Sequence, residues 1–91
     1  MKLPLILLKP FLGKHIEIID SSDPTLVGRS GKIIFESRNM FGIMENNKII
    51  YVPKDICIFK LYLSKNRIIM VNGKELVNRY MKLRKLGRKR R

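Results

Sequence analysis

The chain has 91 residues, 45% of them hydrophobic, which fits one small domain with a single apolar core. This composition excludes a wholly disordered polypeptide, because disordered chains lack the apolar residues that offset chain entropy. Lysine and arginine total 20 against 7 aspartate and glutamate residues, so the net charge is +13. An excess of this size opposes folding by self-repulsion and favours a polyanionic partner such as nucleic acid.

The positive charge is concentrated at the C-terminal end. Residues 79–91 hold eight basic residues and no acidic one. Such a cluster is typical of a protein that binds a phosphate backbone, although basic tails also bind anionic membranes and acidic proteins. The single cysteine, Cys57, permits no internal disulfide and no cysteine-based zinc site, which favours a reducing compartment.

The apolar run Leu3–Leu8 is superficially similar to a signal peptide. It ends at Lys9 and Pro10 without a small-residue cleavage site, and no apolar stretch approaches the ~18 residues of a membrane span. We therefore expect a soluble cytoplasmic protein with no membrane partner. We expect residues 1–12 to form a short helical extension.

From His15 onward, short apolar runs alternate with turn residues, which is typical of a small antiparallel sheet protein. The predicted strands are His15–Asp20, Lys32–Glu36, Met40–Met44, Lys48–Val52, Ile56–Leu63 and Arg67–Val71. One face of the fifth strand carries alternating apolar residues from Cys57 to Leu63. An open sheet of this size exposes its edges, so we predict a mainly β protein with a small closed barrel of five to six strands over residues 13–73.

The connections carry turn signals. The segment Ser21–Pro24 combines side chains that hydrogen-bond the backbone with a fixed proline φ, and it therefore predicts a turn. Gly28 and Gly31 indicate a loop that needs positive φ or close backbone approach. After Gly73 the apolar period shifts to 3.6, which predicts a basic amphipathic helix and tail over residues 74–91. Its expected basic face is Arg79, Lys82, Lys85 and Lys89, opposite Leu76, Val77, Tyr80 and Leu83.

The chain offers few groups for catalysis. His15 is the only histidine, so a barrel-surface role is expected for it. Asp20 and Asp23 are explained better by turn capping than by a magnesium ion, and Cys57 is expected to be buried. Tyr51, Tyr62 and Tyr80 could stack on unpaired RNA bases, but Tyr51 and Tyr62 lie in predicted strands, where ordinary packing is equally compatible with the pattern. We predict no catalytic residue, no metal site and no bound cofactor in this chain.

Distributed basic residues remain as the candidate site. Several lie in predicted loops, which can gather at a barrel rim and follow a phosphate backbone. Arg38 is the strongest candidate, since its hairpin needs no arginine, whereas Asn39 is equally well explained as a left-handed turn residue. The predicted RNA-binding residues are Lys14, Arg29, Lys32, Arg38, Asn39, Lys54, Arg79, Lys82, Arg84, Lys85, Arg88, Lys89, Arg90 and Arg91.

Five runs of this sequence together resemble the archaeal ribonuclease P protein component 1 family, which has a larger eukaryotic counterpart in nuclear ribonuclease P and the related mitochondrial RNA-processing enzyme. They are Leu12–Gly13, Ser22–Gly28, Gly31–Ile33, Glu36–Met40 and Val52–Asp55, and the resemblance extends from about Leu12 to Lys85. Asn78-Arg79-Tyr80 departs from the glycine-arginine-proline that many members carry after the last strand.

The resemblance implies an Sm-like barrel with helical extensions. It also implies a non-catalytic subunit of the ribonucleoprotein that cuts the 5′ leader from precursor tRNA, with magnesium bound to the catalytic RNA subunit. Its implied partners are the ribonuclease P RNA, a zinc-ribbon protein subunit and the other ribonuclease P proteins. Alternatives are a basic barrel protein of the ribosome, an Sm-type ring subunit, a magnesium nuclease that uses Asp20, Asp23 and Asp55, and a membrane-surface role for the tail.

Overall fold

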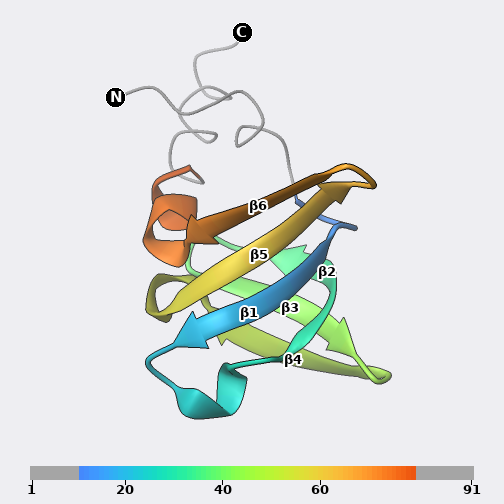
Figure 1. Ribbon diagram of the computed structural model, residues 1–91. Coiled ribbons are helices and arrows are strands. Elements are labelled where there is room, and N and C mark those ends of the chain that lie inside the picture. The colour runs from blue at the N-terminus through green and yellow to red at the C-terminus, as the bar shows by residue number, and fades with distance from the viewer. Residues whose placement is uncertain (1–10, 80–91) are drawn as a thin grey trace, which may run out of the picture.

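The structure is a computed structural model that describes residues 11–79. These residues form an antiparallel sheet of six strands (Figure 1). The strands are β1 (His15–Ser21), β2 (Ser30–Glu36), β3 (Met40–Glu45), β4 (Lys48–Pro53), β5 (Cys57–Ser64) and β6 (Arg67–Asn72). Two short 3₁₀ turns, η2 (Pro24–Leu26) and η3 (Lys54–Ile56), interrupt them, and a helix follows β6 over residues 73–79.

The strands are hydrogen-bonded in the order β4-β3-β2-β1-β5-β6. The sheet curls strongly, so that β1, β5 and β6 lie in front of β3 and β4 in Figure 1. The rings of Phe41 in β3 and Phe59 in β5 meet edge to face with centroids 5.4 Å apart, although β2 and β1 separate these strands in the sheet. The curl therefore brings the two halves of the sheet around one core.

The mainly β prediction is confirmed, and each predicted strand matches an observed one to within two residues at either end. The predicted closure of the barrel is not seen. Within residues 11–79 the strand order has two ends, and the sheet is open between β4 and β6. Pro53 ends the edge strand β4, where its missing N–H costs no ladder hydrogen bond.

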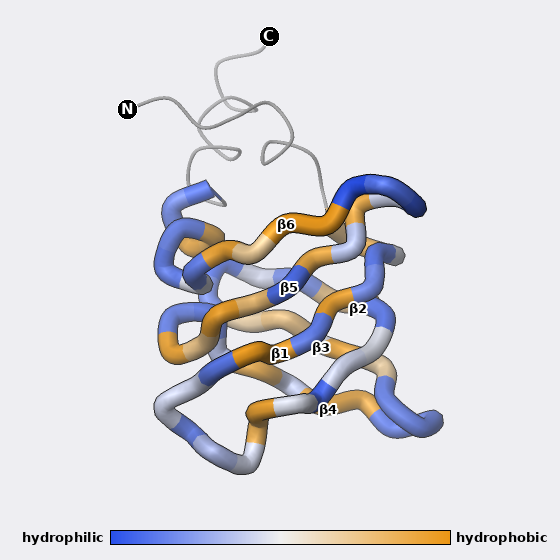
Figure 2. Tube along the Cα trace, viewed as in Figure 1, coloured by the Kyte–Doolittle hydropathy of each residue, from blue (hydrophilic) through white to orange (hydrophobic). Residues whose placement is uncertain are grey.

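Alternation along the strands produces the core. In β5, buried residues alternate with half-buried ones from Cys57 to Leu63, as the sequence pattern predicts. In β1, Ile16 and Ile18 are fully buried. Figure 2 shows this alternation as apolar and polar segments along the strands. The helix adds Leu76, and the segment before β1 adds Phe11. The chain segments that precede and follow the strands therefore both contribute to one core.

The loop predictions are confirmed in part. Asp23 caps the turn η2 by accepting from the backbone N–H of Thr25 at 3.0 Å. Gly28 has a φ of 88°, and a Cβ on Gly31 would lie 2.1 Å from the carbonyl oxygen of Met44. Asn39 does not have positive φ. The non-glycine residues that do, within residues 11–79, are Asn46 and Asn47 in the β3–β4 turn.

Two predictions concern segments at the chain ends. The N-terminal helix over residues 1–12 and the tail after residue 79 lie outside the described residues, apart from Phe11 and Leu12. The described first turns of the C-terminal helix confirm a helix directly after β6. The side-chain carboxamide oxygen of Asn72 accepts from the backbone N–H of Lys74 at 2.9 Å, which starts this helix.

Candidate nucleic-acid interface

A buried cluster of three charges lies where β2, η3 and the helix meet. The Oε2 atom of Glu36 accepts from Lys54 Nζ at 2.7 Å and from an Arg79 guanidinium nitrogen at 2.6 Å. The side chains of Lys54 and Arg79 are 0% and 1% exposed, and that of Glu36 is 7% exposed. Burial lowers the pKa of Lys54, while the hydrogen bond that Lys54 donates to Glu36 opposes this shift.

Aromatic rings cover both cations of this cluster. Lys54 Nζ lies 4.7 Å from the centre of the Phe41 ring, and the Arg79 guanidinium lies 4.0 Å from the centre of the Phe11 ring. Lys54 Nζ also donates to the Ser37 carbonyl at 2.7 Å. Together these contacts join the segment before β1, the β2–β3 hairpin and the C-terminal helix.

The expectation that Lys54 and Arg79 lie on the surface is therefore wrong. Arg79 was placed on the helix face opposite Leu76, but residues three apart on a helix share a face. Leu76 and Arg79 are both fully buried against the sheet. Lys54 is in a 3₁₀ turn that directs its side chain inward to Glu36. These two residues hold the fold together, and neither presents a charge to solvent.

Lys14 and Arg29 are engaged within the protein and partly buried. Lys14 Nζ donates to the Leu63 carbonyl at 3.0 Å and so fastens the start of β1 to the end of β5. Arg29 forms an ion pair of 2.8 Å with Glu45, which also accepts from the backbone N–H of Ser30. These hydrogen bonds lower the pKa of Glu45. The carboxylate of Glu45 therefore largely neutralises the charge of Arg29.

Lys32, Arg38 and Asn39 are exposed, as predicted. Lys32 lies mid-strand in β2, and Arg38 and Asn39 lie in the β2–β3 hairpin. Ser37 closes this hairpin with a backbone bond to Met40 of 2.9 Å, and the carbonyl of Asn39 accepts from the N–H of Lys54 at 2.8 Å. The Arg38 side chain takes no part in either bond, and the residue is exposed on a turn that backbone hydrogen bonds hold.

The predicted loop residues do not gather at one rim. Arg38 precedes β3, whereas Arg29 pairs with Glu45 at the other end of the same strand. A six-residue strand separates these ends by roughly 20 Å, at about 3.3 Å per residue. Antiparallel strands return successive loops to alternate ends of the sheet, and the sequence alone did not show which loops share an end.

Other exposed basic residues were missed by the sequence reasoning. They are Lys48 beside the β3–β4 turn, Lys65 and Arg67 at the β5–β6 turn, and Lys74 in the helix. All four lie in or directly beside predicted turns, and this position was the signal from which they could have been found. The remaining predicted residues, Lys82, Arg84, Lys85, Arg88, Lys89, Arg90 and Arg91, lie outside the described residues.

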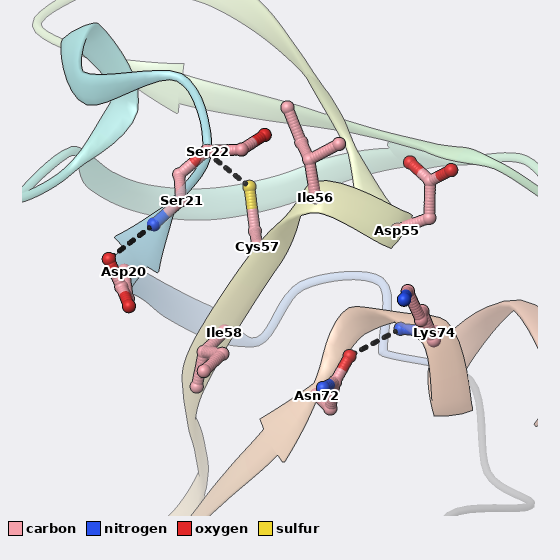
Figure 3. A pocket seen from close by; sticks show the side chains of 9 residues that line it. All are labelled: Asp20, Ser21, Ser22, Asp55, Ile56, Cys57, Ile58, Asn72 and Lys74. Carbon is pink, nitrogen blue, oxygen red and sulfur yellow. Dashed lines mark hydrogen bonds between the residues drawn. The ribbon is translucent and has the colours of Figure 1, made fainter.

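A surface hollow of about 570 Å³ lies between the end of β1, the start of β5 and the end of β6 (Figure 3). Asp20 and Asp55 face it from different elements, with Lys74 nearby. Asp23 is held instead by Thr25. Within residues 11–79, no three histidine, cysteine, aspartate or glutamate side chains gather as a metal site would require.

The lone histidine and cysteine have ordinary environments. His15 is exposed on β1, and its ring meets that of Tyr62 edge to face at 5.2 Å. Cys57 is buried beside Ser21, and burial raises the pKa of its thiol, which opposes formation of the nucleophilic thiolate. No helix in the described part of the chain is long and apolar enough to cross a membrane.

Comparisons with known proteins identify the family. Residues 5–83 match the family described as ribonuclease P/MRP, subunit p29. A ribonuclease P protein component 1 from Sulfurisphaera tokodaii is 44% identical over 71 residues, covering 78% of this chain and 91% of the relative. The protein of that name from Pyrococcus furiosus is 39% identical over 79 residues, covering 86% of this chain and 62% of the relative, so this chain spans less than two thirds of it.

A solved structure described as Mth11, a homologue of the human RNase P protein Rpp29, has a similar fold. Its TM-score is 0.60 at 27% identity, and the alignment covers 76% of this chain and 90% of that chain. These matches confirm the resemblance found from the sequence. The chain belongs to the ribonuclease P/MRP subunit p29 family.

Proposed function

We propose that this chain is an RNA-binding protein subunit of ribonuclease P, the ribonucleoprotein that removes the 5′ leader from precursor tRNA. In this proposal it binds and stabilises the catalytic RNA, and magnesium held by that RNA carries out phosphodiester hydrolysis. Family membership supports the assignment.

The observation that supports RNA binding is that few basic residues form ion pairs within the protein, while others are exposed. The chain has 20 basic and 7 acidic residues. In the described part of the chain, the basic residues that form ion pairs are Arg29, Lys54 and Arg79. Other basic side chains at the strand ends and turns stay exposed, including Arg38, Lys48 and Lys65. An exposed positive surface of this kind binds phosphates and gains free energy from counterion release.

The buried cluster contributes indirectly to binding. Glu36, Lys54 and Arg79 fix the β2–β3 hairpin relative to the start of the basic C-terminal helix. Backbone hydrogen bonds hold the hairpin, so binding need not order the main chain at Arg38, and an arginine can bind a phosphate through two parallel hydrogen bonds. The same framework would support the zinc-ribbon protein subunit, the other ribonuclease P proteins and, within the holoenzyme, precursor tRNA.

Salt dependence tests the binding mode. If Z phosphate contacts form, the logarithm of the affinity for ribonuclease P RNA falls with the logarithm of salt concentration, with a slope of about −0.7Z to −0.9Z. A flat response would contradict the proposal. Purified protein with magnesium but no RNA subunit is expected to leave precursor tRNA intact, and cleavage by the protein alone would instead support the nuclease alternative.

Substitution of Arg38 tests the hairpin. Arg38→Lys keeps the charge but loses the planar pair of donors, so binding to ribonuclease P RNA should weaken. The melting temperature should not change, because the exposed guanidinium makes no bond that closes the hairpin. Lys65→Arg at the β5–β6 turn is a matched control at an exposed position and should bind at least as well as wild type. Equal binding by wild type and Arg38→Lys would reduce Arg38 to a solvated turn residue.

A further inference from the structure

The outer side of β2, β3 and β4 carries apolar side chains where an isolated sheet would carry polar ones. Phe35 is 46% exposed and Tyr51 is 58% exposed. Three further apolar residues of the same strands are also exposed, namely Ile34, Met44 and Ile49. We refer to these five residues as the outer aromatic face. Contiguous exposed apolar surface on a small protein marks an interaction site.

A bulge and a glycine build this face. The β2–β3 register shifts between Ile33 and Phe35, so two consecutive residues, Ile34 and Phe35, are both exposed. Phe35, Gly42 and Tyr51 are paired across the three strands. A Cβ at Gly42 would lie 2.9 Å from the Cβ of Phe35 and 3.3 Å from Cε1 of Tyr51. Because Gly42 has none, the two rings approach each other over it.

The two rings form an ordered pair. Their centroids are 6.0 Å apart with an interplanar angle of 81°. This edge-to-face arrangement limits the freedom of both side chains while leaving about half of each exposed. Rigid, partly exposed aromatic rings are the groups on which proteins stack unpaired nucleic-acid bases.

The charges around the face select the partner. The acidic residues of β2, β3 and β4 are Glu36 and Glu45, and both are held in ion pairs within the protein. Lys32 shares a cross-strand row with Met44 and Ile49 and is exposed. Arg38 and Lys48 are exposed at the two hairpins that border the face. The face is therefore aromatic in the middle and positive at its margins, which complements single-stranded RNA.

We infer that the outer aromatic face is a stacking platform for unpaired nucleotides, with Tyr51 and Phe35 against the bases and Lys32, Arg38 and Lys48 near the phosphates. The inference rests on the proposed RNA-binding function and adds a substrate class to it, namely single-stranded rather than paired segments of the RNA. A second protein on the same face is the competing occupant.

The test compares two RNA probes, a short oligouridine and a fully paired duplex of equal length, with the full chain. Loss of base stacking costs roughly fivefold to 150-fold in affinity per base. Tyr51→Leu keeps apolar bulk but removes the ring, so oligouridine binding should weaken within this range while duplex binding stays unchanged. Tyr51→Phe should bind oligouridine as wild type does. Met70→Ala is the control, since Met70 is 63% exposed on β6, outside the face.

A direct readout comes from Tyr51→Trp. The chain contains no tryptophan, so this variant reports from one position. Stacking should quench its fluorescence as oligouridine is added, and the duplex should leave the fluorescence unchanged. Equal oligouridine binding by wild type and Tyr51→Leu overturns the inference, and weaker assembly of Tyr51→Leu with another protein subunit would then assign the face to a protein. Failure of the wild type to bind oligouridine would also overturn the inference, whereas failure to bind ribonuclease P RNA would overturn the proposed function itself.

Discussion

Removal of the charge of Glu36 is the strongest test of how this fold is held together. Glu36→Gln preserves the shape of the side chain but takes away the anion shared by Lys54 and Arg79. Both cations are fully buried, so water cannot replace the lost partner. Lys54 can respond by losing its proton, because burial already lowers its pKa from 10.5 and Glu36 opposes that shift.

The expected loss is large. Two charges about 4 Å apart attract by about 4 kcal/mol at an effective dielectric constant of about 20. Repulsion between the two cations and the cost of desolvation reduce the net value. Breaking a buried pair by removing one partner typically costs about 3–5 kcal/mol. For a domain of this size, each kcal/mol lowers Tm by about 4–8 °C, so Tm should fall by at least about 12 °C.

Thermal and urea unfolding at pH 7 and pH 10 measure this effect. The folded-state pKa of Lys54 lies below its unfolded value of 10.5, so the unfolded state binds more protons between the two and stability rises with pH there. In Glu36→Gln, the folded-state pKa of Lys54 should be lowered further. The loss of stability relative to wild type should therefore be smaller at pH 10 than at pH 7. Glu17→Gln is the control, since Glu17 accepts only a long hydrogen bond of 3.4 Å from Tyr62. A Tm for Glu36→Gln within a few degrees of wild type at pH 7 would refute the reasoning.

Three further predictions follow from the contacts. Glu45→Gln should make stability depend less on pH below pH 4.5. The pKa of Glu45 is lowered from 4.5, so its contribution to stability is present above pH 4.5 and is lost as the pH falls below it. Urea unfolding at pH 3–6 measures this difference. Deleting residues 80–91 should reduce the salt slope of RNA binding and leave a cooperative melt, whereas deletion from Arg79 onward should also lower Tm because Arg79 is buried. Cys57 should resist alkylation at pH 8 in the native protein and react fully in urea, since it is buried and its thiol pKa is raised; rapid native labelling would contradict its burial.

Alternation and turn chemistry were sufficient to predict the strands. The pattern of β5 from Cys57 to Leu63 follows its burial closely, because one face of a strand in a half-covered sheet must be apolar. Asp23 and Gly28 similarly indicated the turn after β1, since each acts on its own neighbouring backbone. These signals arise from interactions between residues that are close together in the chain, so the sequence alone is enough to recognise them.

The tertiary structure decided which basic side chains are exposed to a partner and which are buried in ion pairs that stabilise the fold. Lys54, Arg79 and Arg38 are all basic residues near predicted turns or helix starts, yet the first two are buried against Glu36 and only Arg38 reaches solvent. The bulge that exposes Phe35 beside Tyr51 depends on how β2 pairs with β3. By itself, the sequence determined the strands, their turns and the positive charge of this protein. The sharing of one carboxylate by two distant cations, and the meeting of two rings over Gly42, depend on contacts between residues far apart in the chain, and only the packed sheet brings these residues together.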